Sequence, residues 1–132
     1  MATMKTADLT GAELDYWVAK AEGLPCVLES YMTLPPRPIA CWLLRENGRP
    51  CFADGPYEPS TKWKVGGPII EHGRIAIELW EGEGERAWAA RPEYCDEYAI
   101  DEGRIWGKTP LIAAMRVFVA ATFGDETPQR ET

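Results

Sequence analysis

Arg74-Ile75-Ala76-Ile77-Glu78-Leu79-Trp80 is the stretch that decides the fold of this 132-residue chain. Ile75, Ile77 and Leu79 alternate with small or polar residues, and this period of two is typical of a β-strand that buries one face. Residues 81–85 then alternate glutamate with glycine, which indicates a flexible acidic turn. Residues 86–90 predict a partner strand after that turn, so an antiparallel pair is expected here.

More strands are expected upstream. Residues 39–45 form a nearly continuous apolar run that ends at Asn47-Gly48, a dipeptide typical of hairpin turns. Residues 50–53 are therefore the expected returning strand of a hairpin. Residues 27–32 predict another short strand, because the prolines between positions 25 and 38 exclude a long helix.

A first helix is predicted over residues 10–22. Thr10 and Glu13 have the spacing of a capping box, in which each side chain bonds the backbone N–H of the other residue. Gly23, followed by proline two residues later, ends the helix. Tyr16 is expected on its exposed side. The residues expected to face the core recur at helical spacing and are Leu14, Trp17, Val18 and Ala21.

A second helix is predicted over residues 110–123. Thr109 is its cap, Pro110 occupies the first position, where a missing N–H does no harm, and Gly124 ends it. Arg116 is the only charged residue within the helix, so burial on more than one side is expected. The polar segment that follows is predicted to be a disordered tail.

These elements predict an α+β fold in which a small antiparallel sheet, formed from residues 27–90, packs against the two helices. Hairpin strands bracketed by helices lack the alternating strand–helix order of a parallel sheet. One domain over residues 1–132 is expected, with a short disordered N-terminal extension. Residues 94–106 are ambiguous, with a helical turn near 95–99 and an extended piece at 104–106.

Composition narrows the functional classes. The chain has 21 acidic and 14 basic residues, a net charge of −7, which argues against direct binding of nucleic acid. No apolar run approaches the ~20 residues of a membrane span, and residues 1–8 lack the apolar core of a signal peptide. A cytosolic protein without membrane contact is therefore expected. Acidic residues gather in two groups, which are Glu81, Glu83 and Glu85, and Glu93, Asp96, Glu97, Asp101 and Glu102.

No metal or cofactor site is expected. The four cysteines, at positions 26, 41, 51 and 95, lack zinc-ligand spacing and are expected to be free, buried thiols. His72 has no His or Cys at ligand spacing and is expected in an exposed turn. Ser60 and Thr61 lack the G-x-S-x-G context of a nucleophile, so no catalytic residue is assigned and an enzyme is the less favoured class.

Residues 57–71, Tyr-Glu-Pro-Ser-Thr-Lys-Trp-Lys-Val-Gly-Gly-Pro-Ile-Ile-Glu, form the segment best suited to binding. It is too irregular for an ordinary strand or helix and too aromatic for a plain linker. Its two aromatic residues offer flat faces, and its glycines allow close backbone approach. The alternative is a structural loop that Trp63 anchors on the sheet. The candidate binding residues are Tyr57, Ser60, Thr61, Trp63, Gly66 and Gly67.

Three stretches resemble a known family. The first is Met4-Lys5-Thr6-Ala7-Asp8-Leu9-Thr10-Gly11, followed by Leu14-Asp15 and Val18-Ala19-Lys20-Ala21-Glu22-Gly23. The second is Tyr57-x-Pro59-Ser60-Thr61-x-Trp63 through Gly66-Gly67-Pro68-Ile69-Ile70-Glu71, and the third is Thr109-Pro110-Leu111-Ile112-Ala113-Ala114-Met115-Arg116 through Gly124-Asp125-Glu126. In order and spacing they resemble the NinX-type family of small bacteriophage proteins. Residues 24–56 and 81–106 carry no family signal. The resemblance implies a phage or prophage origin, hence the host bacterial cytoplasm, and it supplies no catalytic residues.

Two functional hypotheses follow. The first is a non-enzymatic phage accessory protein that binds a host or phage protein, or a small ligand. The second is an acidic inhibitor that imitates nucleic acid and occupies a host DNA-binding protein. The two acidic groups support this second hypothesis, and the 14 basic residues weaken it.

A homodimer through the last helix is also expected. Its small apolar residues, Ala113, Val117, Ala120 and Ala121, would otherwise lie on the surface, and small residues let two helices approach closely. The alternative is that the first helix or residues 91–106 cover this face within one chain.

Overall fold

The computed structural model describes residues 4–30, 38–93 and 103–128. Its helices are α1 (Gly11–Ala21), α2 (Trp63–Gly73) and α3 (Pro110–Phe123). Its strands are β1 (Met4–Lys5), β2 (Cys26–Glu29), β3 (Ala40–Leu43), β4 (Ile75–Leu79), β5 (Trp88–Pro92), β6 (Ile105–Gly107) and β7 (Glu126–Thr127). Short 3₁₀ turns lie at Thr6–Asp8, Phe52–Asp54 and Gly84–Arg86. Helices and antiparallel strands together confirm the α+β class.

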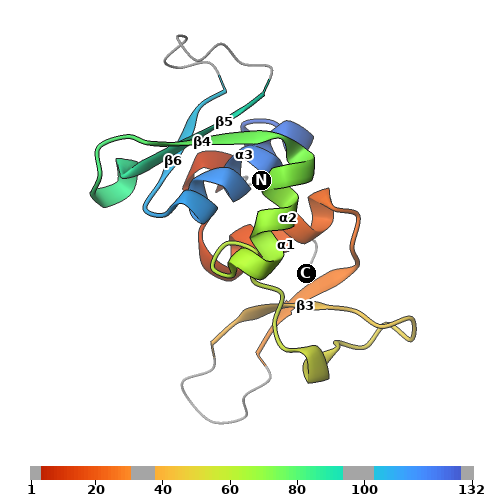
Figure 1. Cartoon of the computed structure of the whole chain (residues 1–132). Coiled ribbons are helices and arrows are strands. Elements are labelled where there is room, and N and C mark those ends of the chain that lie inside the picture. The colour runs from red at the N-terminus through yellow and green to blue at the C-terminus, as the bar shows by residue number, and fades with distance from the viewer. Residues whose placement is uncertain (1–3, 31–37, 94–102, 129–132) are drawn as a thin grey trace.

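Helix α3 lies at the centre of the fold and packs against α1, α2 and the strands β4, β5 and β6 (Figure 1). Its N-terminus is capped as predicted, because Oγ1 of Thr109 accepts the N–H of Ile112 at 3.1 Å and Pro110 occupies the first turn. Gly124 ends the helix at φ 87°, in the left-handed region that glycine enters without steric cost. The buried residues of α3 are Leu111, Ala113, Ala114, Met115, Arg116, Val117 and Val119.

Strands β4, β5 and β6 form a three-stranded antiparallel sheet in that order. Ile77 pairs with Ala90, and Ala89 pairs with Trp106, so β5 is the central strand. This confirms the strands predicted at 74–80 and 86–90 and the extended piece at 104–106. The helical turn expected near 95–99 lies outside the described residues.

The single sheet expected from residues 27–90 is divided into two. Strands β2 and β3 form a separate antiparallel pair in which Val27 lies opposite Trp42. The turn at Asn47-Gly48 is present, but the predicted returning strand at 50–53 is wrong. The pairing is limited to one bridge between Pro50 and Leu44, with the N–H of Cys51 donating to the carbonyl of Leu43, because the chain enters the 3₁₀ turn Phe52–Asp54 directly afterwards.

Helix α2 was not expected, because residues 57–71 were predicted to be irregular. Residues 63–73 are helical in spite of three glycines and Pro68, whose missing N–H removes one bond of the helix. Burial of Gly66 and Ile69, on the side where α2 packs against α3, compensates for this low intrinsic propensity. The described ranges therefore contain three α-helices where two were predicted.

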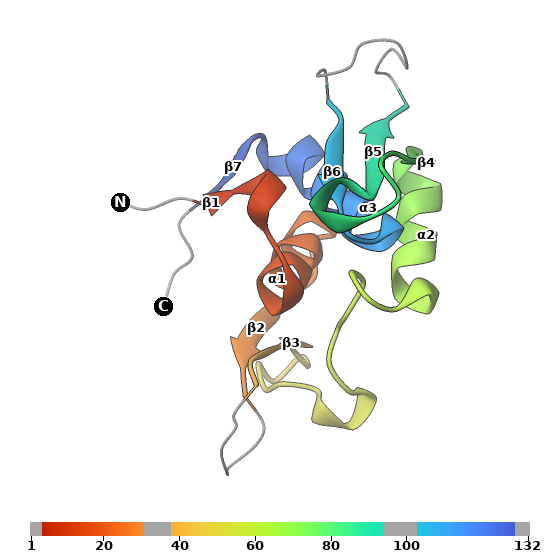
Figure 2. The ribbon, with the colours of Figure 1, turned by 90° about the vertical axis from the view of Figure 1, so that its left-hand side faces the viewer.

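Helix α1 has the predicted limits, but two predictions about it are wrong, namely the capping bond of Thr10 and the exposure of Tyr16. Thr10 occupies the cap position without a side-chain capping bond, so the Thr10 half of the predicted capping box does not form. Tyr16 is only 9% exposed, with its ring edge-on to Trp17 at 5.1 Å between centroids. The cause is that α1 contacts α3 on one side and β2 and β3 on the other, which leaves little of its surface to solvent (Figure 2).

The two ends of the described chain are joined. Strands β1 and β7 pair antiparallel, and the hydroxyl of Thr6 donates to the carbonyl of Gly124 at 2.7 Å (Figure 2). The tail predicted to be disordered therefore begins with an ordered strand. Residues 1–3 and 129–132 lie outside the described residues. None of the helices in the described ranges is long and apolar enough to cross a membrane.

Candidate functional site

The first part of the predicted binding segment is an anchor that holds the chain against α1. The backbone N–H of Ser60 donates to Oδ1 of Asp15 at 2.9 Å. Asp15 is 3% exposed and Ser60 is 2% exposed. Burial raises the pKa of Asp15 to about 6, and the bonds from Ser60 partly oppose that shift. The anchor fixes the position at which α2 begins.

Gly66 lets the first turns of α2 pack closely against the chain next to the anchor. A Cβ at this position would lie 2.4 Å from the carbonyl oxygen of Pro59 and 2.7 Å from Cδ2 of Leu111. Any other residue would push α2 away from α3. Gly67, in contrast, has no atom within 4 Å of the place where its Cβ would lie. The two glycines therefore have different roles, and only Gly66 is required by packing.

Tyr57 connects the segment to the core. Its backbone N–H donates to the carbonyl of Cys41 at 2.8 Å, and its half-buried side chain packs against the hydrophobic core. Burial raises the pKa of Tyr57, with the Glu22 carboxylate adding to the shift, so the phenol stays protonated. Tyr57 therefore offers less free surface to a partner than the sequence suggested.

The second part of the segment is exposed. Thr61, Lys62, Trp63 and Lys64 all lie on the surface, and we call these four residues the Trp63 patch. The Trp63 side chain is 56% exposed, so it does not anchor the segment on the sheet. The six candidate residues therefore differ in exposure. Ser60 and Gly66 are buried, and Tyr57 and Gly67 are partly buried. Thr61 and Trp63 are exposed.

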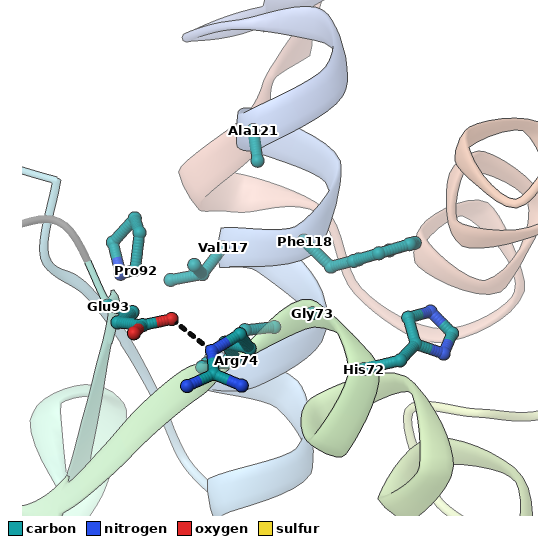
Figure 3. Close-up of a pocket in the computed structure, with 9 residues that line it drawn as sticks. His72, Gly73, Arg74, Pro92, Glu93, Val117, Phe118 and Ala121 are labelled. Carbon is teal, nitrogen blue, oxygen red and sulfur yellow. Dashed lines mark hydrogen bonds and ion pairs between the residues drawn. The ribbon is translucent and has the colours of Figure 1, made fainter.

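A pocket of about 390 Å³ lies at the other end of α2 (Figure 3). Its walls come from the end of α2, the start of β4, the end of β5 and one face of α3. The residues that line it are His72, Gly73, Arg74, Ile75, Pro92, Glu93, Val117, Phe118 and Ala121. Sequence analysis missed this pocket, because its walls come from three parts of the chain that share no local motif.

One ion pair and one histidine–carboxylate contact border this pocket. The Arg74 guanidinium contacts the Glu93 carboxylate, and Nε2 of His72 lies 3.0 Å from Oε1 of Glu22. That buried oxygen has no assigned hydrogen-bond partner among the described residues. His72 is exposed as predicted, although it lies in the last turn of α2 and not in a loop.

Arg74 has an unusual backbone at the mouth of the pocket. Its φ is 53°, the left-handed conformation in which a helix commonly ends, and glycine or asparagine is the usual residue there. Arg74 is the one non-glycine residue with positive φ in the described ranges. The conformation directs the chain from α2 into β4 and leaves the Arg74 side chain on the rim (Figure 3).

The polar and thiol groups near these places differ in exposure. Ser60 is buried away from solvent. No group of three or more His, Cys, Asp or Glu side chains in the described ranges is arranged to hold a metal ion. Cys26, Cys41 and Cys51 are free thiols, and the first two are buried as expected while Cys51 is partly exposed.

The acidic groups are only partly available. Glu81 and Glu83 are exposed in the turn between β4 and β5. Glu85 pairs with Lys108 at 3.2 Å, and Glu93 pairs with Arg74. The other members of the second acidic group, Asp96, Glu97, Asp101 and Glu102, lie outside the described residues.

Comparison with known proteins agrees with the resemblance of the three motifs. No curated protein matches the chain. The family model described as "Bacteriophage P22, NinX" matches residues 5–122, which include the anchor, α1, α2 and nearly all of α3. The chain therefore belongs to the bacteriophage P22 NinX family.

Proposed function

We propose that this phage accessory protein acts without catalysis, by binding a host or phage protein through the Trp63 patch. The observation that carries the proposal is the 56% exposure of Trp63 at the start of a helix whose position the Asp15–Ser60 anchor fixes. Tryptophan is enriched among the residues that dominate binding energy at protein interfaces. A rigid support lowers the entropy that binding costs.

The surroundings of Trp63 favour an acidic partner. Lys62 and Lys64 flank it, and the first turn of α2 contains no acidic residue. The free N–H groups at a helix N-terminus add a partial positive charge. In a chain with a net charge of −7, this is a locally positive, aromatic surface. It fits an apolar hollow bordered by carboxylates on the partner.

Paired pull-downs from infected host lysate test the proposal. Wild type and Leu79→Ala, which truncates a 63% exposed side chain elsewhere, should capture the same partner. Trp63→Ala should lose it while keeping the wild-type circular dichroism spectrum. Equal capture by Trp63→Ala would overturn the assignment to the Trp63 patch.

The pocket at the end of α2 supports the small-ligand form of the binding hypothesis. It has an apolar wall, and its polar groups lie at the rim, the usual arrangement for a small apolar ligand. Such a ligand and a protein partner at Trp63 are compatible, since α2 begins at Trp63 and ends at the pocket.

The alternative function is an acidic inhibitor that imitates nucleic acid. Exposed Glu81 and Glu83 support it, while the ion pairs of Glu85 and Glu93 reduce the charge on offer. Salt separates the two functions. Salt should weaken both kinds of binding, but a mimic, whose contacts are all charged, should lose far more affinity between low and high ionic strength than a contact centred on the Trp63 ring and only bordered by Lys62 and Lys64.

A homodimer through α3 is a further proposal, which fewer residues support than the sequence predicted. Ala113 and Val117 are buried within one chain, so only Ala120, which is partly exposed, and Ala121, which is exposed, still support it. Light scattering should give twice the chain mass of 14.8 kDa, and Ala120→Glu should halve that value. A monomer mass for the wild type would contradict the proposal.

The proposed location is the host bacterial cytoplasm, without membrane or nucleic acid as a direct partner.

A further inference from the structure

Arg116 is the only charged residue of α3, and it is buried. The residue is 5% exposed on a helix whose other residues are apolar or small, apart from Thr122. Its Nε donates to the carbonyl of Leu9 at 2.8 Å and its Nη1 donates to the carbonyl of Trp106 at 2.7 Å. These bonds use two of the five N–H donors of the guanidinium.

Among the described residues, the charge of Arg116 lacks a close counter-charge, since none of their carboxylates is found within ion-pair distance of it. Burial lowers the pKa of Arg116, and the more distant carboxylates of Glu85 and Asp8 only partly oppose that effect. Buried cations are normally paired, because an uncompensated charge in the interior is costly. The two backbone carbonyls accept hydrogen bonds from the guanidinium, but they do not neutralise its charge.

Arg116 lines a surface pocket of about 420 Å³ together with a second arginine. Arg86 lies over the ring of Trp106, with its guanidinium carbon 4.3 Å from the ring centroid. The indole N–H of Trp106 is buried and has no partner among the described residues. The pocket therefore offers N–H donors from two guanidinium groups and from an unpartnered indole, beside the carboxylates of Asp8 and Glu85. The residues that line the pocket are Ala7, Asp8, Thr10, Glu85, Arg86, Trp106 and Arg116.

We infer that this pocket binds a single carboxylate, held by the Arg116 and Arg86 guanidinium groups. The planar fork of an arginine matches the two oxygens of a carboxylate. A dianionic phosphate fits less well, because Asp8 and Glu85 also line the pocket and would repel a second charge. Glu85 is partly neutralised by Lys108, so one negative charge is accommodated.

The carboxylate has two possible sources, a small free acid or an acidic side chain of a peptide. Titration of the full chain followed by ¹H–¹⁵N spectra distinguishes them, with acetate as one probe and an N-acetylated, C-amidated glutamyl tripeptide as the other. The indole signal of Trp106, identified by its loss in Trp106→Phe, reports on the pocket. Chloride and phosphate at matched ionic strength are the controls for anions of other shapes.

Acetate should shift the Trp106 indole signal saturably, at millimolar concentration, and phosphate should do so at least five-fold more weakly. Tighter binding of the tripeptide than of acetate would assign the pocket to a peptide, and equal or weaker binding would assign it to a small acid. Arg86→Gln should weaken binding at least five-fold, whereas Arg49→Gln, at an exposed arginine in a turn, should leave it unchanged. The inference is overturned by an unsaturable shift, by equal responses to chloride and acetate, or by an unaltered response in Arg86→Gln.

Discussion

The backbone N–H of Ser60 donates a 2.9 Å hydrogen bond to the Asp15 carboxylate, which joins two residues 45 positions apart in the chain. Both residues are buried, so the bond forms where water does not compete with it. It ties the segment before α2 to α1. The exposed Trp63 follows three residues later, and its position on the surface therefore depends on a buried carboxylate.

The first prediction concerns this carboxylate and pH. The pKa of Asp15 in the folded chain, about 6, lies above its ordinary value of 3.8, so the folded state binds the proton more tightly than the unfolded state. The contribution of Asp15 to stability is complete below about pH 4 and is lost as pH rises through 6. A shift of this size corresponds to about 3 kcal/mol.

Asp15→Asn isolates this effect, because the amide oxygen still accepts the Ser60 N–H and carries no charge. Urea unfolding should show the variant to be more stable than the wild type at pH 8, with the difference shrinking as pH falls toward 4. A difference independent of pH would show that Asp15 does not titrate in this range.

The second prediction compares two adjacent glycines. Gly66→Ala places a methyl group 2.4 Å from a backbone oxygen of Pro59, and should lower the unfolding free energy by about 2–3 kcal/mol. Gly67→Ala meets open space in a helix and should raise it by about 0.5–1 kcal/mol. Equal losses in the two variants would mean that α2 does not pack as closely on Pro59 and Leu111 as described.

The third prediction separates a surface tryptophan from a core tryptophan. Trp63→Ala should change the unfolding free energy by less than about 0.5 kcal/mol, because the ring is mostly exposed. Trp17→Ala should lower it by about 3–5 kcal/mol, since Trp17 is 5% exposed and lies edge-on to both Tyr16 and Phe123. A large loss of unfolding free energy in Trp63→Ala would show that Trp63 has a structural role.

Elements with strong local signals could be predicted from the sequence. The cap Thr109, the first-turn Pro110 and the final Gly124 delimit α3 correctly, because each satisfies a backbone requirement of a helix end. The period-two pattern of 74–80 places β4 correctly for a similar reason. These signals lie within one turn or one strand of the element that they specify.

Elements that depend on contacts between residues far apart in the chain could not be predicted from the sequence. Helix α2 contains Gly66, Gly67 and Pro68, which argue against a helix until the packing of Gly66 on Pro59 and Leu111 is known. The pairing of β2 with β3 replaced the expected local hairpin in the same way. Of the candidate site, the exposure of Trp63 agrees with a binding role. The burial of Ser60 depends on Asp15, which no local pattern connects to it.

The last prediction concerns the pocket at the end of α2. Its apolar wall, with Val117 and Phe118, should bind an apolar dye such as anilinonaphthalene sulfonate with an increase in fluorescence. Ala121→Phe places a ring at the pocket wall and should reduce the signal several-fold. Thr122→Phe adds the same ring to the next residue of α3, which is exposed and does not line the pocket, and should leave the signal unchanged. Comparable dye binding in all three proteins would place the dye elsewhere and leave the pocket without a ligand class. Native gels or circular dichroism on the two variants would show that the comparison is made between folded chains.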